Sequence, residues 1–369
     1  MGTDPVKFHH NGKPRILFAP LDWGLGHATR SIPLLKYLIE KDFEIIIACK
    51  SNQKNVLAAA LPEAHFEPLK SYSIRLGKTR WLTRLQLVLQ APKFWMGIWQ
   101  ERRMAEQLIK KYHPSLILSD NCYGFRSKNC RSVLLTHQLS IRTGWGSLAD
   151  QLLSWWNRRM VHAFDECWIP DTGPTTGLAG TLSTPAQRFS LPLVYLGGLS
   201  RLKACASPPI KNGTLLILLS GPEPQRSLLE QKILSQALML KQKMILIRGV
   251  RQGKNKIPIN EWLTVIDFME GPELQECLCA AEWVICRSGY STLMDLVRLQ
   301  AKAVLVPTPG QAEQEYLAHH FSKNRWALSI EQEMFELKEA IAQAKQFPYQ
   351  LPDLSFETYK EVIDTRITG

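Results

Sequence analysis

The chain has 369 residues, of which 45% are hydrophobic and 21% are charged, an ordinary balance for a globular protein. This length predicts two domains, because one hydrophobic core rarely organises so many residues. The sequence has no apolar run of about 18 residues, which argues against a membrane-spanning helix. Its polar start lacks the apolar centre of a signal peptide. The net charge of +12 favours anionic partners (nucleotide diphosphates, acidic lipid headgroups or nucleic acid), with a merely basic surface as the alternative.

The eight cysteines are scattered along the chain, and none has the spacing of a zinc site or of a Cys-x-x-Cys pair. Cys277 and Cys279 come closest, in a segment with a helical pattern. We interpret all eight as free thiols of a cytosolic protein.

Apolar runs alternate with helical patterns throughout the first half of the chain. The spacing of Ile32, Leu35, Leu38 and Ile39 predicts a helix after the first apolar run. Continuous β-branched runs joined by helices predict a parallel sheet covered on both faces. The predicted strands are Arg15–Ala19, Glu44–Ala48, Leu116–Ser119 and Val133–Thr136.

A segment rich in Gly, Pro and Ser around 197–209 is typical of a linker, and the alternation restarts after it. The fold class is therefore α/β, with two doubly wound, Rossmann-like domains facing a central cleft, where a ligand is expected. We expect an N-terminal domain at 1–200, a C-terminal domain at 201–350 and a segment at 351–369 that packs back toward the first domain. The later predicted strands are Thr214–Leu219, Met244–Arg248, Leu263–Asp267, Trp283–Cys286 and Ala303–Val306, with helices over 290–299 and 311–321.

The first candidate site is LDWGLGHATRS at 21–31, between the first strand and the first helix. Gly24 and Gly26 allow a tight turn, and the helix start offers free N–H groups to an anion. His27 is a candidate general base, because its reference pKa lies near neutral. A glycine-rich turn with no chemistry is the alternative. Other candidate bases are Asp120 and His137, which follow strands of the same domain.

The second candidate site is CRSGYSTLMDL at 286–296, where a strand ends and a helix begins. Ser288, Gly289, Ser291 and Thr292 are small or hydroxylated, as suits a diphosphate at a helix N-terminus. Asp295 lies about one turn into the helix and could accept both ribose hydroxyls. A capped helix with an acidic first turn is the alternative.

Two further loops follow predicted strands. VPTPGQAEQEY at 306–316 carries amides and carboxylates, including Gln314 and Glu315, which suit sugar hydroxyls; a solvated helix face is the alternative. SGPEPQR at 220–226 places Gly221 at a strand end and stiffens the loop with two prolines. This loop is expected to face the cleft, with a rigid connection as its alternative.

The order and spacing of these four segments resemble family-28 glycosyltransferases, whose fold is GT-B and whose best-known bacterial member adds N-acetylglucosamine to a lipid-linked acceptor. The resemblance implies an inverting transfer from a UDP-sugar with no metal. It implies that Asp295 holds the ribose and that Gln314 and Glu315 bind the donor sugar. The implied diphosphate residues are Gly26, His27, Ser288, Gly289, Ser291, Thr292 and Arg201, and the backbone of Met269 would contact the uracil.

The sequence departs from the family pattern at three places. Ser220-Gly221-Pro222 stands where a Gly-Gly-Ser loop is usual, Gln314-Glu315 replaces a Gln-Gln pair, and Leu25 occupies a common glycine position. These differences leave the identity of the sugar open between N-acetylglucosamine, galactose and other hexoses.

Residues 75–103 hold seven basic residues and one acid, interleaved with Trp81, Trp95 and Trp99. A basic amphipathic segment with tryptophans favours contact with an anionic membrane surface that carries the acceptor. A pair of core helices with basic outer faces is the alternative. No nucleic-acid-binding motif accompanies it, so no nucleic acid is expected. We expect a cytoplasmic protein of cell-envelope synthesis, peripheral on the inner face of the membrane.

Two other functions share this fold. One is a UDP-N-acetylglucosamine 2-epimerase, which would need its own cluster of acids and a histidine around the sugar. The other is a sugar-nucleotide-binding protein without catalysis. The complete donor motif favours a transferase over both.

Overall fold

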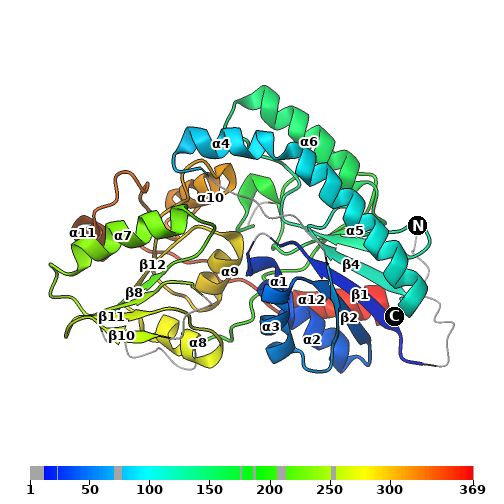
Figure 1. Ribbon diagram of the computed structural model, residues 1–369, viewed down its shortest axis with the longest axis horizontal. Helices are drawn as coiled ribbons and strands as arrows, with labels where there is room; N and C mark the ends of the chain where they lie inside the picture. The colour runs from blue at the N-terminus through cyan, green and yellow to red at the C-terminus, as the bar shows by residue number, and fades with distance from the viewer. Residues whose placement is uncertain are drawn as a thin grey trace. The chain divides into compact units, whose positions relative to one another are not determined.

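A computed structural model describes residues 12–22, 24–69, 77–174, 177–185, 188–205, 213–250 and 255–368. The chain divides into two compact units. Unit 1 comprises 1–74, 89–201 and 354–369, and unit 2 comprises 75–88 and 202–353. Each unit is built around one seven-stranded sheet (Figure 1).

The sheet of unit 1 has the order β3-β2-β1-β4-β5-β6-β7, and all its strand pairs are parallel. Its first strand in the sequence, β1, lies inside the sheet and is buried on both faces, with Ile16, Leu17 and Phe18 fully inaccessible, as expected of a parallel strand covered by helices. The strands are β1 (Arg15–Pro20), β2 (Glu44–Cys49), β3 (His65–Pro68), β4 (Leu116–Asp120), β5 (Arg131–Leu135), β6 (Glu166–Ile169) and β7 (Leu193–Tyr195).

The helices of unit 1 follow its strands, and the C-terminal segment returns to the same unit. Tyr37 on the second helix bonds Asp364 at 2.8 Å and contacts the ring of Tyr359 edge-on. The helices are α1 (Gly26–Arg30), α2 (Ile32–Glu40), α3 (Ser51–Ala60), α5 (Ala91–Tyr112), α6 (Ser147–Val161) and α12 (Thr358–Ile363), with the short helical turns η1 (Gly180–Leu182) and η2 (Asp364–Thr368).

The sheet of unit 2 has the order β10-β11-β9-β8-β12-β13-β14 and is parallel except for the β10–β11 pair. Its strands are β8 (Leu215–Leu218), β9 (Met244–Ile247), β10 (Lys256–Pro258), β11 (Leu263–Ile266), β12 (Trp283–Cys286), β13 (Ala303–Leu305) and β14 (Leu328–Ser329). Its helices are α7 (Gln225–Ala237), α8 (Gly271–Ala280), α9 (Tyr290–Arg298), α10 (Ala312–Lys323) and α11 (Leu337–Gln346), together with α4 (Arg80–Leu89), whose last residue belongs to unit 1.

All nine strands expected from the apolar runs are present, with ends that move by at most two residues. The five that the sequence did not suggest are short and lie toward the sheet edges: β3, β6, β7, β10 and β14. Four of them (β3, β7, β10 and β14) are edge strands, which need less apolar burial, so their composition carries a weaker signal. The fifth, β6, is fully buried but has only four residues.

The expectation that every cysteine is a free thiol is wrong for one pair. Cys205 and Cys279 form a disulfide within unit 2, across a sequence separation of 74 residues and with their Cα atoms 6.0 Å apart. The pairing was invisible in the sequence because only the fold brings the segment at 202–205 beside α8. The remaining six cysteines are free, and four of them are buried.

Candidate active site

The turn between β1 and α1 positions the first candidate residue. Gly24 has φ +107°, a conformation that favours glycine, and α1 begins two residues later at Gly26. His27 is the second residue of α1, and 17% of its side chain remains exposed. The glycine-rich segment therefore places a partly accessible histidine just beyond the end of a buried strand.

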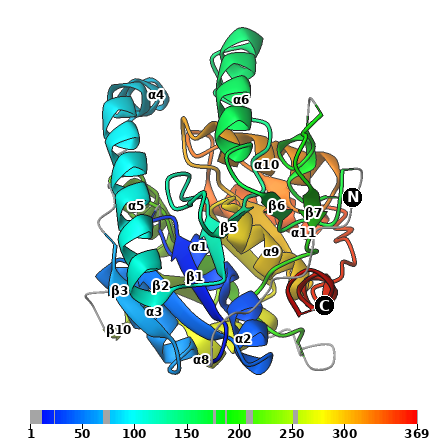
Figure 2. The same cartoon turned by 90° about the vertical axis from the view of Figure 1, so that its right-hand side faces the viewer.

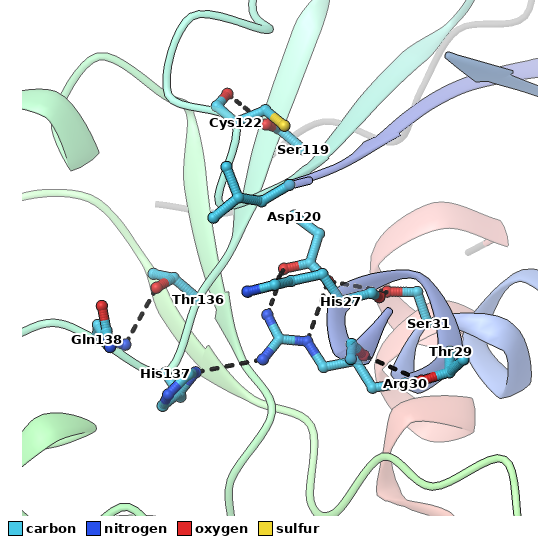
Figure 3. A network of polar contacts seen from close by, with 12 residues as sticks. His27, Thr29, Arg30, Ser31, Ser119, Asp120, Cys122, Thr136, His137 and Gln138 are labelled. Atoms are coloured by element: carbon cyan, nitrogen blue, oxygen red, sulfur yellow. Dashed lines mark hydrogen bonds and ion pairs between the residues drawn. The ribbon is translucent and has the colours of Figure 1, made fainter. Parts of the chain in front are cut away.

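His27 is held by a buried carboxylate. Its Nδ1 lies 2.9 Å from Oδ1 of Asp120, the last residue of β4, whose side chain is completely buried (Figure 3). Since Asp120 is an acceptor when ionised, this contact assigns the proton to Nδ1 and leaves a lone pair on Nε2.

Asp120 is also bound by Arg30, one helical turn after His27. Arg30 Nε donates to Oδ2 at 3.0 Å and Nη2 donates to Oδ1, and the hydroxyl of Ser31 adds a bond to Oδ2 at 3.1 Å. Burial acts to raise the pKa of Asp120, but the charges of Arg30 and His27 outweigh it and lower that pKa to about 2. The carboxylate therefore stays ionised at neutral pH.

His137 completes this network. It follows β5 and is 3% exposed, and its Nδ1 lies 3.3 Å from Nη1 of Arg30 (Figure 3). The sequence offered His27, Asp120 and His137 as alternative bases. The fold joins all three in one network, in which Asp120 contacts His27 and Arg30 links Asp120 to His137. Sequence reasoning missed Arg30, although its place three residues after His27 puts both on one helix face.

In unit 2, the candidate residues lie where parallel strands end. Ser288 and Gly289 follow β12, Gly289 is the N-cap of α9, and Ser291 and Thr292 lie in its first turn. Because the N-cap is a glycine, it has no side-chain oxygen to cap the first N–H groups, which suits an anion. Asp295 follows on α9 and is half-buried.

The hydroxyl of Ser288 has a structural partner. This residue is fully buried, and its Oγ donates to the carbonyl oxygen of Gln314 at 2.8 Å. The contact ties the β12–α9 turn to the first turn of α10. The two donor motifs predicted from sequence are therefore joined directly.

The side chains of Gln314 and Glu315 fold back onto the turn before α10. Gln314 Oε1 accepts a bond from the N–H of Thr308 at 3.0 Å, and Glu315 Oε1 accepts one from Gly310 at 2.8 Å. Both side chains are thereby fixed against the backbone of residues 308–310, and both remain half-buried.

The other expected donor residues lie at separate places. Gly221 follows β8 with φ +98°, and Met269 lies half-buried between β11 and α8. Arg201 is the last residue of its stretch of unit 1, and its Nε is buried without a hydrogen-bond acceptor among the described residues. Within those residues, no group of three His, Cys, Asp or Glu side chains is arranged to hold a metal ion.

Comparison with known families decides the class of unit 2. Residues 225–358 match the glycosyltransferase family 28 C-terminal domain. This stretch is similar to the family 28 domain. It contains the β12–α9 turn, the β13–α10 turn and Met269, so the resemblance drawn from those motifs is confirmed.

Curated relatives extend the similarity over most of the chain. They are named UDP-N-acetylglucosamine–N-acetylmuramyl-(pentapeptide) pyrophosphoryl-undecaprenol N-acetylglucosamine transferase. The protein from Pasteurella multocida is 23% identical over 83% of this chain and 80% of its own. That from Histophilus somni is 24% identical over 79% and 78%.

Solved structures share the fold of the whole chain. The glycosyltransferase of kitacinnamycin has a TM-score of 0.62 at 15% identity, covering 91% of this chain and 92% of its own. MurG of Acinetobacter baumannii has a TM-score of 0.54 at 14% identity, covering 94% of each. The GT-B fold predicted from sequence is confirmed. Together with the family 28 domain, these relatives identify an enzyme, a glycosyltransferase, and do not favour the epimerase or a non-catalytic binding protein.

Proposed function

We propose that this protein is an inverting transferase that moves a hexose or N-acetylhexosamine from a UDP-sugar to an acceptor hydroxyl. The observation that carries the proposal is the family 28 domain, whose matched stretch holds the uncapped start of α9 next to Asp295. Relatives of this chain are named for a UDP-sugar donor and a lipid-linked acceptor.

Unit 2 binds the donor in this proposal. The N–H groups at the start of α9, with Ser291 and Thr292, hold the diphosphate, and Asp295 accepts the ribose hydroxyls. The loop containing Met269 contacts the uracil, and Gly221 allows the β8 loop to approach the diphosphate. Negative charge that builds on the leaving diphosphate is stabilised by these donors, each worth about 1.5–3 kcal/mol when the bond is to a charged group.

Unit 1 supplies the base. The acceptor oxygen forms a bond to the anomeric carbon, the bond from that carbon to the β-phosphate oxygen breaks, and UDP leaves. The acceptor proton moves to Nε2 of His27, whose other nitrogen is held by Asp120 at 2.9 Å. Because Asp120 is ionised, it stabilises the imidazolium that forms. Gly26 and Arg201 contribute donors toward the phosphates.

Calorimetric titration with UDP, GDP, CDP, TDP and NAD tests the donor site. We expect UDP to bind and Asp295→Ala to abolish that binding. The matched control is Glu339→Ala, which removes an exposed acid from α11 of the same unit. Unchanged UDP binding by the Asp295 variant would refute the donor-site assignment, and preference for another nucleotide would refute the donor class.

We place the membrane contact on α5 and α6. Within the described residues no helix is long and apolar enough to cross a bilayer. The two helices pack through aromatic rings, with Trp95 and Trp156 centred 5.3 Å apart, and both extend past the strands of their sheet (Figure 2). Exposed apolar side chains gather on this helix pair, and they are Trp95, Met96, Trp99, Leu148, Leu152, Leu153 and Trp155.

Arginines accompany two of the exposed tryptophans. Arg103 lies over the ring of Trp99 at 5.6 Å and Arg159 over the ring of Trp155 at 5.3 Å. A tryptophan with an arginine beside it matches the interface between acyl chains and anionic headgroups. This surface would hold the protein on the cytoplasmic face of a membrane and so bring the protein close to a lipid-linked acceptor. Of the expected basic segment, Arg75 lies outside the described residues, and Arg80 is ion-paired within unit 2.

Cosedimentation with vesicles of phosphatidylglycerol and phosphatidylcholine tests this surface. Trp99→Ser combined with Leu148→Ser should lower the bound fraction, because both exposed apolar anchors are lost. Met239→Ser is the control, since Met239 is 87% exposed in unit 2 and belongs to neither helix. Equal partitioning of the double variant and the control would remove the membrane assignment and leave the transferase proposal intact.

A further inference from the structure

A short segment from the first part of the sequence is built into unit 2. Residues 77–83, here named the docked segment, precede α5 in the chain but cluster with the family 28 domain. The side-chain amide of Gln225, 1% exposed, donates to the carbonyl oxygens of Gly77 at 2.9 Å and Lys78 at 3.1 Å. A buried amide committed to two carbonyls marks a defined docking position rather than a loose contact.

The amide of Gln225 is itself held in place. Gln332 donates to its Oε1 at 3.1 Å. Arg287, 1% exposed, donates to the carbonyl oxygen of Gln225 at 2.8 Å and to Oε1 of Gln332 at 2.6 Å. Burial lowers the pKa of Arg287 to about 10, which still leaves it charged at neutral pH. The network therefore fixes the docked segment by buried polar groups.

The docked segment lies directly on the turn between β13 and α10. Gly310 has φ +82°, and a Cβ there would come within 2.6 Å of the carbonyl oxygen of Arg80 and 2.9 Å of Cβ of Thr83. Thr83 is fully buried. Only glycine permits so close an approach of the two backbones in this conformation.

This approach brings Arg80 to Glu315. Arg80 Nε lies 3.4 Å from Glu315 Oε1, the same oxygen that accepts the N–H of Gly310. Arg80 also bonds Glu331, with Nη2 3.0 Å from Oε2. The carboxylate of Glu315 is thus oriented by one backbone donor and one guanidinium, and the guanidinium comes from a segment far away in the sequence.

We infer that Arg80 is a positioning residue of the donor-sugar site, which fixes Glu315 and makes the docked segment a determinant of the sugar that is accepted. The inference rests on the proposed function, because it takes Glu315 as a group that binds the donor sugar. A carboxylate beside a guanidinium keeps a fixed direction, so it accepts hydrogen bonds from sugar hydroxyls at one defined place. The nucleotide part of the donor, held at α9, does not depend on this pair.

The test compares dissociation constants for UDP alone with those for UDP-glucose, UDP-galactose and UDP-N-acetylglucosamine. The dissociation constant for UDP, divided by that for the most tightly bound UDP-sugar, measures how much the sugar contributes to affinity. Arg80→Gln should lower this ratio about two- to fivefold, the range expected of a partly exposed ion pair. Binding of UDP itself should stay within about twofold. Arg80→Lys should restore part of the ratio, because it keeps the charge.

Two control variants and a double variant sharpen the result. Lys78→Gln removes a charge from the docked segment, and Glu331→Gln removes the other carboxylate partner of Arg80; both should leave the ratio unchanged. Arg80→Gln should have little further effect in a Glu315→Gln background, because the two residues act as one unit. In turnover assays, Arg80→Gln should raise KM for the UDP-sugar more than it lowers kcat.

The outcomes separate this inference from the proposed function. Failure of the wild-type protein to bind UDP would overturn both. Normal UDP binding with an unchanged ratio in Arg80→Gln would overturn only the role of Arg80. An equal loss of affinity for UDP and for UDP-sugars, or the same effect from Lys78→Gln, would show that the segment merely supports the fold or the general charge of the unit.

Discussion

The two candidate sites use opposite means to prepare for their ligands. In unit 1 the site is a buried network of charged side chains, in which Asp120 holds His27 and Arg30. In unit 2 the site consists of turns and a helix start, where glycines, hydroxyls and backbone N–H groups follow the strand ends. The charged network of unit 1 suits a general base, which must keep one tautomer. The turns and helix start of unit 2 suit an anion, which needs many hydrogen-bond donors.

The largest effect should come from removing the base. His27→Gln leaves a polar side chain of similar size but cannot accept the acceptor's proton at neutral pH. We expect kcat to fall about a hundred- to ten-thousand-fold, the usual contribution of general base catalysis, with UDP affinity unchanged. Steady-state kinetics and calorimetry measure the two quantities. Normal turnover in this variant would exclude His27 as the base and weaken the contrast between the units.

Removing the anchor of the same network should cost stability. Asp120→Ala leaves Arg30 buried without its counter-charge, which typically destabilises a protein by about 3–5 kcal/mol. Urea unfolding of the variant measures this loss.

The pH dependence of the wild-type protein gives an independent check. The folded pKa of Asp120 is about 2, below its unfolded value of about 3.9. Its stabilising contribution is therefore complete above pH 4 and is lost as the pH falls toward 2. A wild-type stability that does not change across this range would contradict the ion network.

Glu101 offers a buried acid of unit 1 with a different environment. It is 1% exposed on α5 and accepts a bond from the N–H of Gly124 at 2.9 Å. Burial raises the pKa of Glu101 to about 7, despite the opposing effect of that bond. The contrast with Asp120 shows that a neighbouring cation, not burial alone, decides whether an acid stays ionised here.

Glu101→Gln tests this contrast. A raised folded pKa means that wild-type stability is complete below about pH 4.5 and is lost as the pH rises through 7. The variant should therefore be more stable than the wild type at pH 8, by at most about 3 kcal/mol, and equal to it at pH 4.5. Thermal unfolding at both pH values measures the difference. A gain of the same size at both would point to packing instead of ionisation.

The smallest effect should come from the buried amide of Gln225 in unit 2. Gln225→Ala leaves the carbonyls of Gly77 and Lys78 without that donor and should cost about 1–3 kcal/mol, less than the loss of Asp120. Urea unfolding compares the two variants directly. A cost as large as that of Asp120→Ala would mean that the two units do not differ in how their sites are held.

Much of the fold was predictable because it depends on local patterns. Long apolar runs predicted the inner strands of both sheets. The motifs at 286–296 and 306–316 indicated the donor-binding unit, because a strand end followed by glycine and hydroxyl residues is a recognisable local sequence pattern. The edge strands were missed, as was the disulfide between Cys205 and Cys279, because neither has a local signature. In the same way, the sequence presented His27, Asp120 and His137 as separate candidates.

The sequence by itself determined that the chain has an α/β fold of two parallel-sheet units, and which strand ends bear polar residues, because hydrophobic periodicity and turn chemistry act over a few neighbouring residues. Only the tertiary structure decided which of those polar groups meet. Arg30 reaches Asp120 across 90 residues, and Arg80 pairs with an acid at position 315. These pairs form because a buried charge needs a partner and because packing brings distant backbone segments close together. Both conditions depend on the folded chain as a whole.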